Sequence, residues 1–232
     1  MSIWGWGIAA LGVCALLYWL VVLGEGTYLG RYAVRCIYQR GARIYDEVRR
    51  NVTASDETTL LPILRAGLAG YACPRVLDVA TGTGRVPLLI GRQPWFDGSI
   101  CAIDLTPNML AQARAKLAAA GLLERVALRL GSAESLPWPD ADFDLVTSLE
   151  ALEFFPRPRR ALAEMARTLK PGGTLLISKY PDPWARALPF KGLTQRAMTR
   201  LLARLQFEAI EYRNWQPGHY ELVIARKVNL AR

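Results

Sequence analysis

An apolar strand runs directly into a glycine-rich turn at residues 76–84, and this junction constrains the fold more than any other part of the sequence. The segment reads Val76-Leu77-Asp78-Val79-Ala80-Thr81-Gly82-Thr83-Gly84. Glycine permits a tight turn and lets a ligand approach the backbone closely. A strand, such a turn and a following helix are typical of nucleotide-binding α/β folds, in which the amides of the turn face a polar ligand group.

An acidic residue follows this turn at the spacing expected for ribose recognition. Asp104 lies 20 residues after Gly84, at the end of the next apolar run. A carboxylate there can accept hydrogen bonds from both ribose hydroxyls. The nicotinamide fingerprint is incomplete because Pro87 stands where its third glycine belongs, and no Gly-Lys-Ser/Thr follows for a P-loop. The pattern predicts a site for a ribose-containing ligand, and a nicotinamide reductase stays open as an alternative.

Short apolar runs alternate with helical ones from residue 71 onward, which is typical of α/β folds with a largely parallel sheet. Seven strands are predicted, at 75–79, 99–103, 125–130, 143–147, 174–178, 207–213 and 219–226. Only residues 214–218 separate the last two, so we expect them to pair as an antiparallel hairpin. The predicted fold class is α/β, with a Rossmann-like, seven-stranded, mostly parallel sheet over residues 71–232.

Helices are expected between these strands and before them. Thr106 and Pro107 can begin a helix, and residues 159–170 carry apolar side chains on one side. Residues 196–205 form a basic amphipathic helix that can lie on a membrane or pack on the core. Residues 31–70 are expected to be a helical connector interrupted at Pro62, because proline lacks the amide donor that a helix interior needs.

The N-terminal residues 1–24 contain no charged side chain. A helix as long as the apolar run 3–23 spans roughly 30 Å, the thickness of a bilayer core. A cleaved signal peptide would need a basic start, and a buried core helix would be shorter and would show a polar stripe. We predict a transmembrane anchor over residues 1–30 that contacts the lipid bilayer through 3–23.

Basic residues follow this apolar run, and none precedes it. Six arginines lie between residues 31 and 50, so the positive-inside rule predicts a single-pass protein with its N-terminus outside and its domain in the cytoplasm. The whole chain carries a formal charge of +9, which suits anionic lipid. Because this charge is diffuse and a tether is awkward for such a role, nucleic acid is disfavoured as a partner.

Cysteine and histidine are too sparse for a metal site. The four cysteines are widely spaced and His219 is the single histidine. Zinc needs clustered thiolates or imidazoles, so no metal is expected, and no disulfide framework is visible.

Five ordered sequence blocks identify a family resemblance. They are Asp78 to Gly84, Ala102 to Met109, Gly131 to Trp138, Asp142 to Val146, and Leu169 to Gly173. In these blocks the chain resembles the class I S-adenosylmethionine-dependent methyltransferases, in the branch that includes quinone and small-lipid methyltransferases. The resemblance covers about residues 40 to 227.

The resemblance implies S-adenosyl-L-methionine as the cofactor and assigns its contacts residue by residue. The loop would hold the methionine end, Asp104 the ribose, and the remaining residues the adenine or the transferred methyl group. The implied contacts are Asp78, Ala80, Gly82, Gly84, Asp104, Leu105, Met109, Ala133, Glu134 and Ser148.

The resemblance also implies direct in-line displacement, in which an acceptor attacks the sulfonium methyl group and a neutral thioether leaves. Orientation and exclusion of water then carry most of the catalysis, and a base is needed only for an acceptor with a proton to lose. Glu150 directly follows the fourth predicted strand and is the first candidate for that base. Tyr45 resembles a tyrosine that closes over the cofactor in this branch and is the second catalytic candidate. Glu153 and His219 are further candidates.

Residues 179–190 are rich in aromatic, proline and basic side chains, and in this family that region often builds the acceptor pocket. Together with the predicted anchor, this favours a small lipophilic acceptor such as a quinone precursor, another phenol or a lipid amine. Two alternatives remain open. One is methyl transfer to small thiols or xenobiotics, and the other is a cofactor-binding membrane module without turnover.

Overall fold

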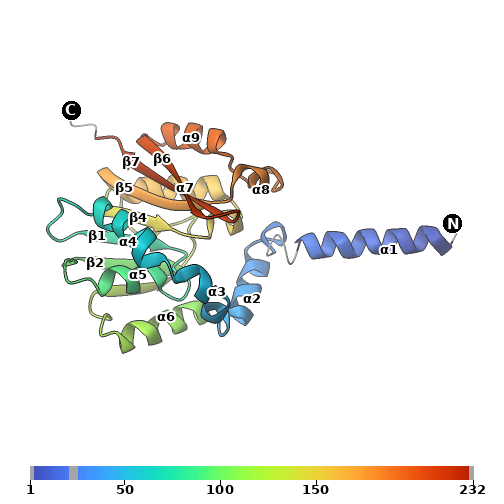
Figure 1. Cartoon of the computed structure of the whole chain (residues 1–232), viewed down its shortest axis with the longest axis horizontal. Coiled ribbons are helices and arrows are strands. Elements are labelled where there is room, and N and C mark those ends of the chain that lie inside the picture. The colour runs from blue at the N-terminus through green and yellow to red at the C-terminus, as the bar shows by residue number, and fades with distance from the viewer. Residues whose placement is uncertain (1–2, 21–25, 230–232) are drawn as a thin grey trace.

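The computed structural model describes residues 3–20 and 26–229, and its largest unit is a seven-stranded sheet (Figure 1). The strands lie in the order β3-β2-β1-β4-β5-β7-β6. Strands β1 to β5 run parallel, whereas β7 pairs antiparallel with β5 and β6. The bounds are β1 Arg75–Val79, β2 Ser99–Asp104, β3 Val126–Leu130, β4 Phe143–Ser148, β5 Leu169–Lys179, β6 Phe207–Gln216 and β7 Tyr220–Lys227. The predicted α/β sheet and its C-terminal hairpin are confirmed.

The central strands are buried on both faces, which explains why they read as nearly continuous apolar runs. Every residue of β4 is buried, and in β1 only Arg75 keeps partial exposure. Leu77 and Val79 enter the core on one face of the sheet, whereas Val76 enters the core on the other. The strand order reverses between β1 and β4, the point at which open α/β sheets bind ligands.

Helices cover both faces of this sheet (Figure 1). The helices after the connector are α5 Arg85–Gly91, α6 Pro107–Ala119, α7 Pro158–Thr168, α8 Asp182–Arg186 and α9 Gln195–Arg204, with a 3-10 turn η3 at Leu152–Phe154. Ile90 and Leu117 belong to the core on one face, and Leu162 to the core on the other. Met198 and Leu202 of α9 are buried in that second core, so the basic amphipathic helix packs on the domain with its arginines exposed.

The connector at residues 31–70 consists of three helices. They are α2 Arg31–Gly41, α3 Tyr45–Thr53 and α4 Asp56–Gly67, preceded by the 3-10 turn η2 Thr27–Leu29. The predicted interruption at Pro62 is wrong, because α4 runs through it. A proline removes one amide donor, and the buried side chains of Leu60, Ile63 and Leu64 hold the helix on the core.

The boundary predicted at residue 170 is also wrong. Helix α7 ends at Thr168, and Leu169 begins β5, five residues before the predicted strand. Leu169 pairs with Phe143 of β4. Pairing across the sheet therefore overrides the helical periodicity of the local sequence.

Helix α1 (Ile3–Tyr18) projects away from the domain (Figure 1). Its described side chains, from Trp6 to Tyr18, are exposed. Within residues 3–20 and 26–229, no helix is both long and apolar enough to cross a membrane. The predicted transmembrane helix is therefore not supported: the α-helix ends at Tyr18, and residues 21–23 of the predicted span lie outside the described residues.

We expect Gly84→Ala to destabilise the fold more than Gly121→Ala. Both glycines have a positive φ, +84° and +68°, a conformation that costs an L-residue about 1–2 kcal/mol. A Cβ at Gly84 would also lie 3.3 Å from the Cβ of Ala113, whereas one at Gly121 would meet open space. Urea unfolding of both variants measures the difference, and equal losses would contradict a packing role for Gly84.

Candidate functional site

The carboxyl ends of β1, β2 and β4 open onto two adjoining cavities. Five residues line both of them: Tyr45, Ala80, Gly82, Leu149 and Glu150. The second cavity has a volume of about 440 Å³, and the first, which is partly open to solvent, has a volume of about 100 Å³. The first cavity extends toward the ends of β2 and β3 and toward α2, whereas the second extends toward α3, α4 and α5. The two cavities together could hold one elongated ligand.

The residues predicted to contact ribose and adenine lie together at the first cavity. Asp104, Leu105, Met109, Ala133 and Glu134 all line it. They come from the end of β2, the start of α6 and the loop after β3, so the parallel sheet brings them to one edge. The structure brings these five residues together, and their contacts with a cofactor stay a prediction.

The Asp104 carboxylate organises the loop that it faces. The backbone N–H of Gly82 donates to one oxygen at 2.9 Å, and that of Thr106 donates to the other at 2.8 Å. Burial raises the pKa of Asp104, and these amide hydrogen bonds oppose the rise. Each carboxylate oxygen keeps further acceptor capacity. Asp104 can therefore hold the loop and accept hydrogen bonds from ligand hydroxyls at the same time.

Asp78 lies at the second cavity, in a less favourable environment for a charge. Its side chain is 3% exposed and accepts a hydrogen bond from the Thr147 hydroxyl at 2.6 Å. Burial raises the pKa of Asp78 to about 6, and the Thr147 hydroxyl opposes the rise. A cationic ligand group beside the carboxylate would favour its ionised form. The position therefore suits an ammonium group.

The turn between β1 and α5 is built from left-handed residues. Ala80, Gly82 and Gly84 have φ values of +58°, +55° and +84°. The space where Gly82 would carry a Cβ is open, so a ligand can approach that backbone. Gly84 lines neither cavity and instead caps α5 against Ala113. Gly84 thus has a packing role, and its predicted contact with the cofactor stays a prediction.

Ser148 and Glu134 are also predicted to contact the cofactor, and those contacts stay predictions. Ser148 is fully buried in β4 and lines neither cavity, whereas the next residue, Leu149, lines both. Glu134 lines the first cavity, but Arg157 holds its carboxylate through a guanidinium 2.7 Å away and a backbone N–H at 2.6 Å. Glu134 thus fixes the rim of the cavity.

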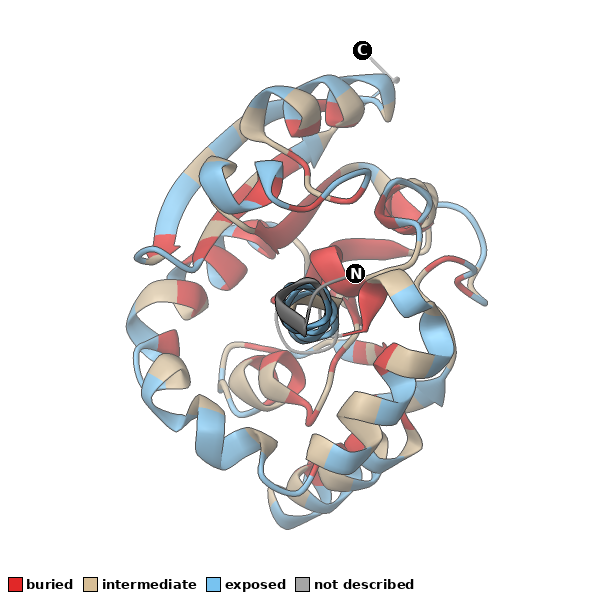
Figure 2. Cartoon of the chain, turned by 90° about the vertical axis from the view of Figure 1, so that its right-hand side faces the viewer, coloured by how far each residue is buried: buried red, intermediate tan, exposed pale blue. Residues whose placement is uncertain are grey.

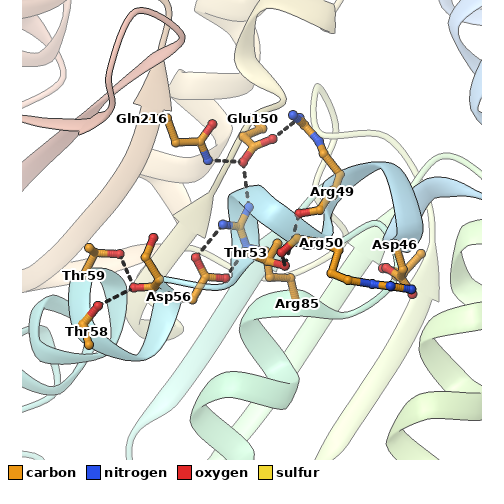
Figure 3. Close-up of polar contacts among 12 residues, drawn as sticks. Asp46, Arg49, Arg50, Thr53, Asp56, Thr58, Thr59, Arg85, Glu150 and Gln216 are labelled. Carbon is orange, nitrogen blue, oxygen red and sulfur yellow. Dashed lines mark hydrogen bonds and ion pairs between the residues drawn. The ribbon is translucent and has the colours of Figure 1, made fainter.

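Glu150 is the centre of a buried ionic network (Figure 3). Its carboxylate binds Arg49 of α3, Arg85 of α5 at 2.6 Å and the side-chain amide of Gln216 in β6 at 2.6 Å. Arg85 also binds Asp56 of α4, at 2.5 and 2.6 Å. This network joins three helices and β6 to the end of β4. It favours a positioning role for Glu150, and the role as a base stays a prediction.

Helix α3 is fastened across the glycine-rich turn. Asp46 accepts a hydrogen bond from the Thr83 hydroxyl at 2.6 Å and pairs with Lys116 of α6 at 2.8 Å. The guanidinium of Arg49 lies 5.9 Å from the ring centroid of Tyr45. Tyr45 is thereby held where the two cavities meet, and its predicted catalytic role stays a prediction.

The sequence interpretation missed the contribution of α2 and of two arginines. Arg31, Val34 and Tyr38 line the first cavity from α2. Their spacing of three and four residues places them on one helix face, and this pattern was the available signal. Arg49 and Arg85 were missed because their acidic partners are far away in the sequence.

Comparison with known proteins identifies this architecture. Residues 77–177 match the family described as Methyltransferase domain. This segment runs from β1 into β5 and includes the glycine-rich turn, both buried aspartates and Glu150. The match supports an S-adenosylmethionine-dependent methyltransferase domain in this part of the chain.

The relatives of this methyltransferase domain include enzymes named for quinone methylation. The chain is 36% identical over 143 residues to the ubiquinone/menaquinone biosynthesis C-methyltransferase UbiE of Geobacter sulfurreducens, covering 60% of this chain and 55% of the relative. It is 37% identical over 115 residues to the demethylmenaquinone methyltransferase of Symbiobacterium thermophilum, covering 50% and 46%. The chain thus spans about half the length of the curated relatives it matches.

A solved structure shares the fold. The SAM dependent methyltransferase from Aquifex aeolicus matches with a TM-score of 0.59 at 21% identity, over 75% of this chain and 93% of that one. The family match supports S-adenosyl-L-methionine as the cofactor of the methyltransferase domain. The cavity chemistry fits that molecule, because a buried acid suits its ammonium and a second acid with free acceptor capacity suits its ribose.

We expect Asp78→Asn to stabilise the ligand-free protein at pH 8 by up to about 3 kcal/mol, because the buried carboxylate has its pKa raised from 3.8 to about 6. Because the pKa of Asp78 is higher in the folded protein than in the unfolded chain, its contribution to the free energy of unfolding is complete below pH 3.8. That contribution is lost as the pH rises through about 6 and the buried carboxylate ionises. The gain from the variant should therefore shrink as pH falls below 6. Urea unfolding at several pH values measures it, with the exposed Asp97→Asn as control. An unchanged stability difference across pH would contradict the buried charge.

Arg49→Met and Glu150→Gln should show a coupling free energy of about 0.5–3 kcal/mol in a double-mutant cycle of unfolding. The reason is that the two side chains meet in the network that fastens α3. Arg49→Met paired with Asp97→Asn is the control, because those residues share no contact. Additive effects in the Arg49–Glu150 cycle would exclude the fastening role.

Proposed function

We propose that the protein is an S-adenosylmethionine-dependent methyltransferase that acts on a small lipophilic acceptor of the quinone-precursor type. The relatives named for quinone methylation support the acceptor class. The observation that carries the proposal is the pair of buried carboxylates, Asp78 and Asp104, on two cavities that meet at the glycine-rich turn.

In this proposal the chain holds the cofactor along both cavities. Asp78 binds the ammonium group, Asp104 accepts hydrogen bonds from the ribose hydroxyls, and Leu105 and Met109 pack on the adenine. When bound, S-adenosylmethionine supplies an electrophilic methyl group on a sulfonium. The residues of the chain orient the partners and exclude water, effects that supply about 7–11 kcal/mol in favourable cases.

The acceptor is proposed to lie in the first cavity beside α2. Apolar side chains of Val34, Leu149, Phe154 and Phe155 line the first cavity and suit a lipophilic ring. Glu150 acts as a positioning residue in this proposal, because it holds α3, and with it Tyr45, through Arg49.

We propose that the chain is a single-pass membrane protein, with its N-terminus outside and its domain in the cytoplasm. The uncharged run at residues 3–23 and the arginines that follow it support this proposal. Helix α1 contributes the first part of that run, with its described apolar side chains exposed.

Methyl transfer from labelled cofactor to a prenylated hydroquinone in membrane extract is the expected activity.

Asp104→Ala should weaken cofactor binding about 100-fold, because a charged hydrogen-bond acceptor to ligand hydroxyls is lost. It should also lower the stability of the fold, since the Gly82 and Thr106 amides lose their acceptor. Calorimetric titration of wild type and variant with the cofactor measures the affinity, and thermal unfolding supplies the control for folding. Equal affinities would exclude the ribose role.

An acceptor panel separates the alternatives. Labelling of small thiols in preference to the hydroquinone would favour the thiol methyltransferase. Tight cofactor binding with no labelled product on any acceptor would favour a non-catalytic membrane module.

A further inference from the structure

Large apolar side chains are exposed on the domain around the base of α1. Leu29 and Tyr32 are 54% and 74% exposed, Trp184 is 58% exposed, and Phe190 is 100% exposed. We call these four residues the docking face. They belong to two segments, 27–32 and 184–191, that are more than 150 residues apart in the chain.

Direct contacts hold these two segments side by side. The Tyr28 hydroxyl donates a hydrogen bond to the carbonyl oxygen of Pro189 at 3.1 Å. The buried Lys191 ammonium binds Thr27 and lies 4.9 Å from the ring centroid of Tyr28. The docking face is therefore one surface built on a fixed base, and Figure 2 looks along α1 onto this side of the molecule.

Phe190 is not buried against any of the described residues, 3–20 and 26–229. Its side chain is fully exposed, and its backbone has a φ of +64°, which is unfavourable for a bulky L-residue. Burial in the domain therefore does not account for a bulky apolar residue at this position, and we look for a contact outside the chain.

Two observations indicate what covers the docking face: the charged residues around it, and the continuity of the face with α1. Arg31, Arg35 and Arg186 are exposed beside it, and aromatic residues flanked by arginines match the interface of an anionic bilayer. The ring of Trp19, directly after α1, stacks on Tyr28 at 4.9 Å. The exposed apolar surface of α1 thus continues into the docking face.

We propose that the docking face inserts into the interfacial layer of an anionic lipid bilayer and sets the domain with its first cavity beside the lipid. Arg31 and Val34 of α2, next to Tyr32, line that cavity. A lipophilic acceptor could then pass from the bilayer into the cavity along α2. The purpose of this contact rests on the proposed function, but the contact itself involves no residue assigned to the cofactor.

Site-specific photocrosslinking tests the contact in the full chain. Phe190→p-benzoylphenylalanine is compared with Leu123→p-benzoylphenylalanine, because Leu123 is also an exposed apolar residue, 40% exposed, and lies outside the docking face. Each protein is reconstituted in vesicles of phosphatidylcholine with phosphatidylglycerol and irradiated. We expect lipid adducts at position 190, a several-fold lower yield at position 123, and a lower yield at 190 when phosphatidylglycerol is omitted.

Several outcomes would overturn the docking proposal. No lipid adduct at position 190, an equal yield at the two positions, a yield independent of anionic lipid, or an adduct to a second copy of the chain would each do so. Phe190→Gly is the folding control: its Tm should stay equal or rise, because glycine adopts a positive φ without strain, and a clear fall would show that Phe190 packs within the fold. Lipid adducts without methyl transfer would support the docking face while contradicting the proposed function.

Discussion

The hydrogen bonds between one buried carboxylate and two backbone amides hold the geometry on which the rest of the site depends. Asp104 ends β2 and accepts from Gly82, in the turn after β1, and from Thr106, before α6. One side chain therefore fixes two neighbouring strand-to-helix turns. A buried carboxylate without these donors would be costly, and with them it keeps capacity to bind a ligand.

The same carboxyl edge carries a second layer of buried charge that fixes the N-terminal helices. Arg85 forms ion pairs with both Asp56 and Glu150. Glu150 also pairs with Arg49 and accepts a hydrogen bond from the side-chain amide of Gln216. Breaking a buried ion pair is strongly destabilising because it leaves an unpaired charge. Helix α3 is therefore held closely over the turn. Helix α2, which joins it, carries both a wall of the first cavity and part of the docking face.

Much of the fold could be predicted because its signals are local. The apolar run before Asp78, the glycine-rich turn and the acid at the end of β2 are all readable within a few residues. The missed features depend on distant partners. Leu169 is a strand residue because Phe143 lies opposite, and α4 passes Pro62 because the core holds it. Ser148 is buried and lines neither cavity, although its neighbour Leu149 lines both.

By itself the sequence determined the sheet, the hairpin and the chemical character of the residues at the strand ends, because strand burial and turn conformation follow from side chains close together in the chain. Only the tertiary structure decided that Glu150 would be surrounded by donors from three other elements, and that Lys191 would hold the turn after α1 against the segment of Phe190. Such contacts join segments far apart in the sequence. They arise only when the sheet orders those segments at one edge.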